Sequence, residues 1–255
     1  MKSEPNLPRI SKKSFLLDKM KKVSIILPAH NEGKSIYNTI MEIQNAVENN
    51  SKYYFEIFIS EDGSRDDTRA QVLKAAKDSK IEITLSPETA RLGYSKAILR
   101  AIKLVNSEIL VFLDSDGQYD PKEIGVLLDQ LIERTVVVGY RNPRVDSSLR
   151  IIYSNAFRIV FYLLFRLKLK DPSSPFIVAQ KKDVETLAKI EFYLAYGFWW
   201  EFQARINRMQ LEVLEVPVTH RNRVQGETQV YTLKKLPKII QTHLVGLFKL
   251  KNEIG

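Results

Sequence analysis

The sequence predicts an α/β protein with a Rossmann-like, mostly parallel sheet covered by helices on both faces. Short runs of apolar, β-branched residues recur through the first 140 residues, and stretches with helical spacing separate them. This alternation is typical of βαβ units, whose strands lie parallel in one sheet. Several runs end abruptly in polar residues, as strands do at the ligand-binding edge of such a sheet.

The strands of this part are predicted from apolar runs bounded by turn residues. VSIIL at 23–27 is closed by Pro28, and FEIFIS at 55–60 is followed by the polar group EDGS. The run ILVFL ends at Asp114, a pattern that indicates a strand buried on both faces. The predicted strands are, in order, 23–27, 55–60, 81–85, 109–113 and 136–139.

Helices are predicted between these strands, where apolar residues recur at every third or fourth position. The segment that opens with Asn31 keeps this spacing up to Val47, and Asp66 or Asp67 is a suitable N-cap for the next helix. The predicted helices cover about 31–47, 66–76, 95–105 and 121–132.

Beyond residue 140 the alternation is less regular, and we expect an elaboration of the same domain. An apolar and basic helix at 149–169 precedes a loop at 171–175, and a short strand and helix follow. A helix at 199–209, a strand at 211–218 and a final helix at 233–250 complete the chain. The expected division is a basic leader at 1–22 and one domain at 23–255, with halves at 23–140 and 141–255.

Composition excludes several classes of function. The chain of 255 residues has no cysteine and three scattered histidines, so disulfides, thiolate zinc sites and cysteine nucleophiles are excluded. Its net charge of +9 favours anionic partners. No zinc-finger, RNP or zipper pattern is present, so we expect phosphate-bearing substrates and an anionic membrane surface, and no nucleic acid.

Neither a signal peptide nor a membrane-spanning helix is predicted. The longest apolar stretch, 151–169, is interrupted by Arg158, Arg166 and Lys168. This stretch and the last helix have the pattern of basic amphipathic helices that lie in the headgroup plane, although a core helix with solvated basic residues would share it. We expect a cytoplasmic protein peripheral to the membrane face, with an integral membrane protein as a further candidate partner.

The segment EILVFLDSDGQYDP, residues 108–121, carries the most informative polar cluster. Asp114 and Asp116 follow a buried strand one residue apart, and the amide of Gln118 comes two residues later. Such oxygens suit Mg²⁺ or Mn²⁺, and Mg²⁺ usually shares its ligands between one or two carboxylates and substrate phosphates. Aspartates that cap a turn or the helix at Pro121 would give the same pattern. We expect a metal-dependent diphosphate site here.

Three polar segments should meet at the carboxyl edge of the sheet: 28–32, 62–64 and 114–118. The G-K-S sequence at Gly33 suggests a P-loop, but Pro28 stands where that motif needs its first glycine. No G-x-G-x-x-G follows the first strand, which disfavours a dinucleotide enzyme.

Six segments in register resemble one family. PAHNEG, EDGSRDDT, RLGYSKA, DSDGQYDP, GYR and HRNRVQGETQ occur in the order and spacing of inverting family 2 glycosyltransferases, over roughly residues 22–245. The resemblance is greatest to the polyprenyl-phosphate branch, typified by the dolichol-phosphate mannose synthases. It implies a GT-A fold with an acceptor-side C-terminal elaboration. It also implies transfer of a hexose from a nucleotide sugar to dolichyl or undecaprenyl phosphate, with Mg²⁺ or Mn²⁺.

The resemblance assigns roles to individual residues. The nucleotide would be bound by Pro28, His30, Glu32, Asp62, Asp114 and Ser115. The metal ligands would be Asp116, Gln118 and Asp114. The catalytic side chains would be Asp116, Arg141 and Arg223, and the acceptor phosphate would be held by Arg221, Gly226 and Thr228. Gln229 and Ile177 replace basic residues frequent in the family, which leaves the acceptor less defined than the donor.

The acceptor class depends on whether a general base is available. A hydroxyl acceptor needs a base, whereas a phosphate monoester is already ionised at pH 7. One acid, Glu201, occurs near the predicted acceptor helix, as a catalytic base or as a partner that orients Arg205. We therefore favour the phosphate acceptor. The alternatives are a transferase acting on a saccharide or glycolipid hydroxyl, and a non-catalytic nucleotide-binding or membrane adaptor protein.

Overall fold

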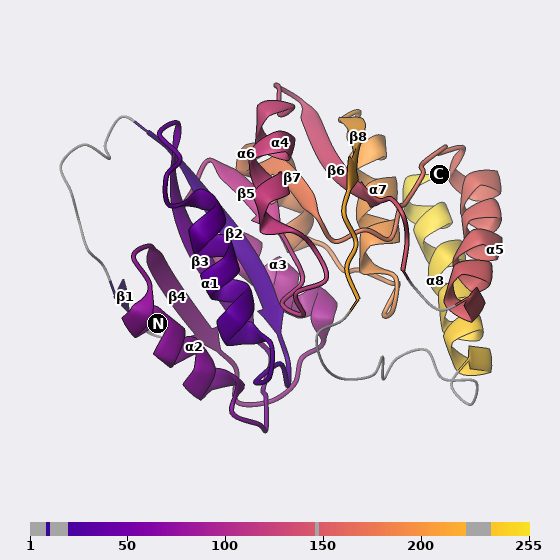
Figure 1. Cartoon of the computed structure of the whole chain (residues 1–255). Coiled ribbons are helices and arrows are strands. Elements are labelled where there is room, and N and C mark those ends of the chain that lie inside the picture. The colour runs from indigo at the N-terminus through magenta and orange to yellow at the C-terminus, as the bar shows by residue number, and fades with distance from the viewer. Residues whose placement is uncertain (1–8, 11–19, 146–147, 223–235) are drawn as a thin grey trace, which may run out of the picture.

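The protein is built on one mixed sheet with helices on both faces (Figure 1). The computed structural model describes residues 9–10, 20–145, 148–222 and 236–255. Within these residues the strand order is β1-β4-β3-β2-β5-β7-β6-β8. The strands are β1 Arg9–Ile10, β2 Lys21–Ala29, β3 Tyr53–Glu61, β4 Glu82–Pro87, β5 Ile109–Phe112, β6 Thr135–Arg141, β7 Ile177–Gln180 and β8 Glu212–Val218.

All strands of this sheet run in one direction except β1 and β7, which confirms the predicted mostly parallel sheet. β2 is parallel to β3 and β5, and β3 is parallel to β4. β7 is antiparallel to both β5 and β6. Its place between them was not predicted, because an apolar run of four residues has the same pattern in either direction.

Helices pack against both faces of the sheet. Their bounds are α1 Ile36–Val47, α2 Thr68–Asp78, α3 Tyr94–Leu104, α4 Ile124–Asp129, α5 Ser148–Phe165, α6 Lys181–Val184, α7 Phe198–Arg208 and α8 Leu236–Ile254, with 3-10 turns η2 Pro121–Glu123 and η3 Glu185–Lys189. One core cluster joins α1, α2 and α4 to one face, and a second joins α3, α6, η3 and α7 to the other. Ile25 and Leu27 belong to the first cluster and Ile26 to the second, as strand alternation requires.

A third cluster lies outside the sheet, where α5 and α8 pack together beyond β8 (Figure 1). Phe161 of α5, Trp200 of α7 and Leu247 of α8 are buried in it. The elaboration after residue 140 therefore has a small core of its own.

The predicted elements occur in the structure with shifted ends. α1 begins at Ile36, because the amides of Ser35 and Ile36 close a turn on the carbonyl of Glu32. The helix predicted at 121–132 is divided into η2 and α4 and ends at Asp129. Part of the predicted leader is in the sheet: β1 pairs with β4, and β2 begins at Lys21.

Candidate active site

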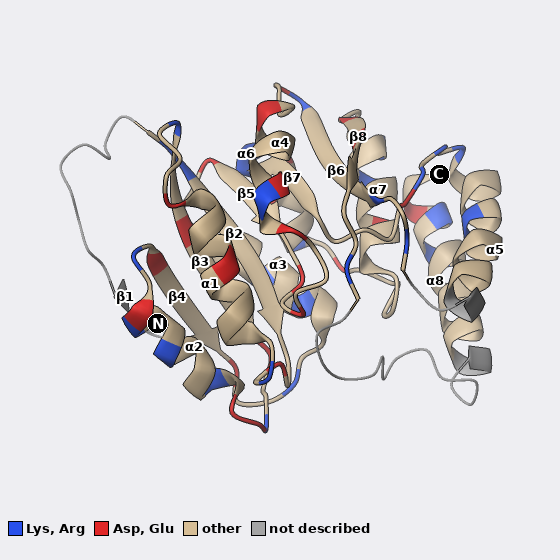
Figure 2. Cartoon of the chain, viewed as in Figure 1, with Lys and Arg blue, Asp and Glu red and all other residues tan. Residues whose placement is uncertain are grey.

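The carboxyl ends of β2, β3 and β5 lie side by side, as the sequence predicts. Pro28 pairs with Ser60 and Ala29 with Glu61, and the amide of Leu113 donates to the carbonyl of Ile26 at 3.1 Å. Residues 30–33, 62–64 and 114–118 therefore leave the sheet at one edge. Figure 2 shows charged residues of both signs along the edge where β2 and β3 end.

The loop after β2 is bound to the loop after β3 through its own amides. The N–H groups of residues 31, 32 and 33 donate to the side chains of Ser64, Thr68 and Asp66, at 3.0, 2.8 and 3.1 Å. These donors are used inside the fold, so they do not form the phosphate-binding loop that G-K-S suggests. Glu32 lies at this loop, and its carboxylate accepts a bond from Ser35 Oγ at 2.9 Å.

Asp62 fixes the loop that precedes α3. Its two carboxylate oxygens accept the N–H groups of Leu92 and Gly93, at 2.6 and 2.9 Å. Gly63 allows this approach, because its φ is +65° and a Cβ there would lie 2.6 Å from the backbone of residues 90 and 91. Nδ1 of His30 lies 2.8 Å from the carbonyl of Asp62, so these two predicted nucleotide residues are neighbours.

Ser115 has a structural role that the sequence did not reveal. Its hydroxyl donates to the carbonyl of Pro28 at 2.8 Å, and its own carbonyl accepts bonds from Ser35 and Thr39. The side chain is buried and joins the ends of β2 and β5. Pro28 takes part through its backbone. The hydroxyl proton of Ser115 is therefore used within the protein, and its contact with the nucleotide stays a prediction.

Asp114 and Asp116 form the acidic centre of the site. Arg141 and Glu32 lie close enough for their charges to shift the pKa of Asp114. Burial raises the pKa of Asp114 to about 7; the charges of Asp116 and Glu32 act in the same direction, and that of Arg141 opposes them. Asp116 is buried, and its Oδ1 accepts the backbone N–H of Gln118 at 3.1 Å. Two mutually repelling carboxylates are thus placed at the end of β5.

The amide of Gln118 has other contacts. Its Nε2 lies 3.3 Å from the carbonyl of Arg221 and 3.3 Å from Nε2 of His220. His220 is buried, and its Nδ1 accepts the N–H of Val145 at 3.2 Å. The predicted metal ligand Gln118 therefore connects the acidic loop to the segment after β8.

The donor set fits a divalent cation with few protein ligands. Among the described residues, no group of three or more His, Cys, Asp or Glu is placed to hold a metal ion. Mg²⁺ in phosphate sites commonly uses one or two carboxylates and takes its other ligands from water and substrate phosphates. The close pair of Asp114 and Asp116 meets that requirement, since a cation would relieve their mutual repulsion.

Arg141 is fixed by a buried ion pair. Its Nε and Nη2 bond to the two oxygens of Asp171 at 2.6 and 2.8 Å, and Nη2 also donates to Ser173 Oγ at 2.6 Å. The Arg141 guanidinium holds the pKa of Asp171 far below its usual range, against the effect of burial. Asp171 comes from the loop before β7, and its pairing with Arg141 was not predicted.

Two predicted site residues, Glu201 and Arg221, form bonds and ion pairs with other parts of the protein. Glu201 is fully buried; it accepts the N–H groups of Tyr193 and Leu194 at 2.7 and 2.8 Å and pairs with Arg205 at 2.7 Å. These contacts match the alternative interpretation, that Glu201 orients Arg205, and its role as a catalytic base stays a prediction. Arg221 was predicted to hold the acceptor phosphate. Instead it forms ion pairs with Glu42 at 2.9 Å and Asp120 at 2.6 Å.

The remaining predicted residues, Arg223, Gly226 and Thr228, lie outside the described residues. Sequence reasoning missed Tyr94, which contacts the acidic centre, and Trp199, which contacts Tyr94. Tyr94 bonds to Asp114 at 2.8 Å, and Trp199 bonds to Tyr94 at 2.9 Å. The motif RLGYSKA contains Tyr94, but only the folded chain brings it to Asp114.

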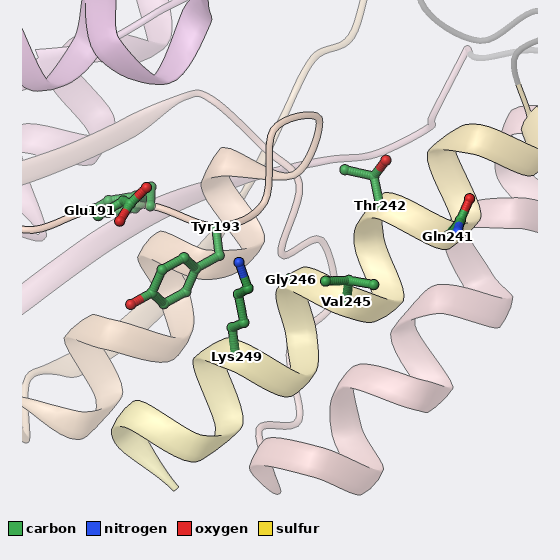
Figure 3. A pocket seen from close by; sticks show the side chains of 8 residues that line it. Glu191, Tyr193, Gln241, Thr242, Val245, Gly246 and Lys249 are labelled. Carbon is green, nitrogen blue, oxygen red and sulfur yellow. The ribbon is translucent and has the colours of Figure 1, made fainter.

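A separate pocket of about 350 Å³ lies between α8 and the segment before α7 (Figure 3). Its lining includes Glu191 and Tyr193 on one side and Val245 and Lys249 on the other. None of the predicted site residues lines it. The strand ends remain the candidate active site.

Comparison with known proteins identifies the family. The model of Glycosyl transferase family 2 matches residues 24–182, more than half of the chain. The chain belongs to glycosyl transferase family 2. This glycosyltransferase is therefore an enzyme, as predicted, and the matched region contains the acidic centre and Arg141.

Two curated relatives share part of its sequence. The dolichol-phosphate mannosyltransferase of Pyrococcus furiosus is 26% identical over 252 residues, which cover 89% of this chain and 68% of the relative. The undecaprenyl-phosphate 4-deoxy-4-formamido-L-arabinose transferase of Salmonella choleraesuis is 32% identical over 148 residues, 58% of this chain and 44% of the relative. The chain thus spans about two thirds of the first relative and less than half of the second.

The fold is shared with solved structures of a GT-A enzyme. Glucosyl-3-phosphoglycerate synthase from Mycobacterium tuberculosis, solved with Mn²⁺, uridine-diphosphate-glucose and phosphoglyceric acid, superposes with a TM-score of 0.68 at 19% identity. The match covers 91% of this chain and 80% of the synthase. The same enzyme with Mg²⁺ and uridine-diphosphate also gives 0.68. The GT-A expectation for this glycosyltransferase is confirmed.

Proposed function

We propose that this glycosyltransferase moves a hexose from a nucleoside diphosphate sugar to a polyprenyl phosphate, with inversion at the sugar carbon. The observation that carries the proposal is the meeting of Asp114, Asp116 and Arg141 at the carboxyl edge of the sheet. This edge is where open α/β sheets bind ligands. The names of both curated relatives contain a polyprenyl phosphate, which supports the same acceptor class here.

The donor half of the reaction needs stabilisation of the leaving diphosphate. Asp114 and Asp116 would hold Mg²⁺ or Mn²⁺, which acts as a Lewis acid on the phosphate oxygens when bound. His30, Glu32 and Asp62 lie around the same edge, where the nucleotide would bind. Arg141 adds a positive charge that its pairing with Asp171 keeps in one orientation.

A phosphate acceptor is supported by the contacts of two acidic residues other than Asp114 and Asp116. Glu201 is saturated by Arg205 and two backbone donors, and Asp171 is paired with Arg141. A carboxylate whose pKa is strongly lowered is a weak base, so Asp171 is poorly suited to deprotonate a hydroxyl. A phosphate monoester needs no such base, because its second pKa is about 6.

An exposed apolar surface on α5 and α8 suits a lipid bilayer. On α5, Ile152, Ile159 and Leu163 are 65, 63 and 59% exposed; on α8, Leu244 and Phe248 are 41 and 61% exposed. Exposed basic side chains accompany them: Arg158, Arg166, Lys168, Lys170 and Lys249. Apolar side chains flanked by basic ones bind anionic membrane surfaces. No helix in the described part of the chain has the length and apolarity to cross a membrane.

The test of the acceptor is a transfer assay with radiolabelled nucleotide sugars, offered polyprenyl phosphate or a soluble saccharide. We expect label in the organic-soluble product, lost on addition of EDTA and in Asp116→Ala. Asp129→Ala removes an exposed acid that pairs with Lys52 at the surface and is the matched control. Label in the saccharide and none in lipid would establish the hydroxyl alternative instead.

The membrane surface is tested by sedimentation with vesicles of phosphatidylglycerol or phosphatidylcholine. We expect binding to the anionic vesicles, reduced at least tenfold by Ile159→Glu together with Phe248→Glu. Ile132→Glu is the control, because Ile132 is 62% exposed but lies outside α5 and α8. Equal sedimentation of the unaltered protein, the double variant and the control would exclude this surface, and equal binding to both lipids would exclude charge as a cause.

A further inference from the structure

A hydrogen-bonded chain of two aromatic residues connects α7 to the acidic centre. Nε1 of Trp199 lies 2.9 Å from the hydroxyl of Tyr94, and that hydroxyl lies 2.8 Å from Oδ1 of Asp114. Trp199 and Tyr94 are 105 residues apart in the chain. Tyr94 is the first residue of α3, and Asp114 follows β5.

The direction of both bonds is fixed by chemistry. An indole N–H only donates, so the Tyr94 oxygen must accept from Trp199. The single phenolic proton is then left for Asp114, whose carboxylate accepts it. A phenol has an ordinary pKa of about 10, so this proton is present at neutral pH. Bonds in such a chain polarise and strengthen one another.

Trp199, the hydrogen-bond donor to Tyr94, is held rigidly by its neighbours. Trp199 is 5% exposed, and its ring makes edge contacts with Phe112 at 5.3 Å and Phe202 at 5.4 Å between centroids. Tyr94 itself makes edge contacts with Phe198 and Trp199. Tyr94 as a whole residue is 36% exposed, so packing alone does not fix its hydroxyl. The bond from Trp199 supplies that constraint.

Among the described residues, Tyr94 is the one side chain that hydrogen-bonds to Asp114. The other acid of the pair, Asp116, has its Oδ1 bonded to the backbone N–H of Gln118 instead. The bond from Tyr94 occupies Oδ1 of Asp114 and sets the orientation of the whole carboxylate. Groups that orient metal-binding carboxylates in this way affect metal affinity by about 10–100-fold when they are removed.

We propose that Tyr94 is a positioning residue for divalent-cation binding, and that Trp199 acts through it by fixing the direction of its hydroxyl. This inference rests on the proposed function, because it assumes that Asp114 contributes to a cation site. In this proposal α7 packs in the core and also, through Trp199, helps to orient a carboxylate of the donor site.

The test measures Mn²⁺ binding by electron paramagnetic resonance, with UDP and in parallel with GDP, so that the readout is independent of transfer. Tyr94→Phe removes the hydroxyl and keeps the ring. Tyr37→Phe is the matched control, because Tyr37 also donates to an aspartate, Asp78, at 2.8 Å, but on the outer surface of α1 and α2. We expect the Mn²⁺ dissociation constant to rise about tenfold in Tyr94→Phe and to stay within twofold in Tyr37→Phe.

A double-mutant cycle separates positioning from packing. Trp199→Phe keeps an aromatic ring and removes the N–H, and we expect a smaller rise of the Mn²⁺ dissociation constant, about threefold. In the Tyr94→Phe background the same change should have no further effect on Mn²⁺ binding, although it lowers the melting temperature. If Tyr94→Phe does not fold, the inference is decided by whether the Mn²⁺ dissociation constant rises in Trp199→Phe alone.

Three results would overturn the inference. Mn²⁺ affinity within twofold of the unaltered protein in Tyr94→Phe would do so, whatever its melting temperature. Fully additive effects in the double variant would show that Trp199 does not act through Tyr94. If the unaltered protein binds no Mn²⁺ with either nucleotide, the proposed function fails together with the inference. In the first two cases the unaltered protein binds Mn²⁺, and the inference alone fails.

Discussion

The acidic residues around the site differ in what their carboxylates already contact. Asp114 and Asp116 repel each other; Asp114 accepts a bond from the hydroxyl of Tyr94, and Asp116 accepts one from the backbone N–H of Gln118. Glu201 and Asp171, in contrast, are each saturated by an arginine and by further donors. Acids of the first kind suit a cation, and acids of the second kind stabilise the fold.

Glu201→Gln tests this division directly. The substitution removes the charge opposite Arg205, which keeps its second partner Glu253 at 2.9 Å. We expect the free energy of unfolding to fall by about 1–3 kcal/mol, while the transfer rate of the folded protein stays within about threefold. Urea unfolding and the transfer assay measure the two quantities. A folded variant that loses about 100-fold or more in rate would support Glu201 as a general base.

Asp171→Asn tests the ion pair that fixes Arg141. The pKa of Asp171 is lowered in the folded protein, so its ionised form contributes stability above the unfolded pKa of about 4, and this contribution is lost as the pH falls below that value. We expect Asp171→Asn to cost about 3–5 kcal/mol at pH 7. Below pH 4 the difference from the unaltered protein should shrink. A difference independent of pH, measured by urea unfolding, would contradict the ion-pair account.

At the scale of elements, α5 and α8 depend on each other and on the segment before α7. His243 of α8 is 2% exposed, and its Nδ1 lies 3.1 Å from the hydroxyl of Tyr153 on α5. Its ring lies against Phe157, and a Cβ on Gly197 would approach its Nε2 to 3.4 Å. A neutral imidazole thus fills the space between the two helices that carry the exposed apolar surface.

The pH dependence of stability follows from this burial. Burial lowers the pKa of His243 from 6.5 to about 4. The unfolded chain therefore binds a proton that the folded protein does not, and stability falls as the pH drops from about 6.5 to about 4. The loss attributable to His243 is at most roughly 3 kcal/mol. His243→Phe should flatten the unfolding free energy across this range, and an unchanged pH profile in chemical denaturation would contradict the assignment.

At the scale of the whole molecule, the sheet and its ligand edge could be predicted from sequence because both follow from periodicity. The apolar runs and the polar residues that end them give strand order only in part, but they place Asp62 and Asp114 at one edge. The antiparallel β7 was not predictable in this way, since its direction depends on the path of the chain between residues 141 and 177.

The partners of charged side chains were the least predictable part. Arg221 pairs with Glu42, 179 residues earlier, and Arg141 with Asp171, 30 residues later. A motif shows that an arginine is present, but its contacts depend on which acids the fold brings near it. For the same reason Tyr94 was not predicted as a partner of Asp114.

The most direct measurement is nucleotide binding by thermal shift, with UDP and GDP, in Mn²⁺ or in EDTA. If Asp114 and Asp116 hold a diphosphate through a divalent cation, one of these nucleotides at about 100 times its Kd should stabilise the protein by about 2.7 kcal/mol in Mn²⁺. The stabilisation should disappear in EDTA and in Asp116→Ala. Equal stabilisation with and without the metal, or in Asp116→Ala, would contradict the account.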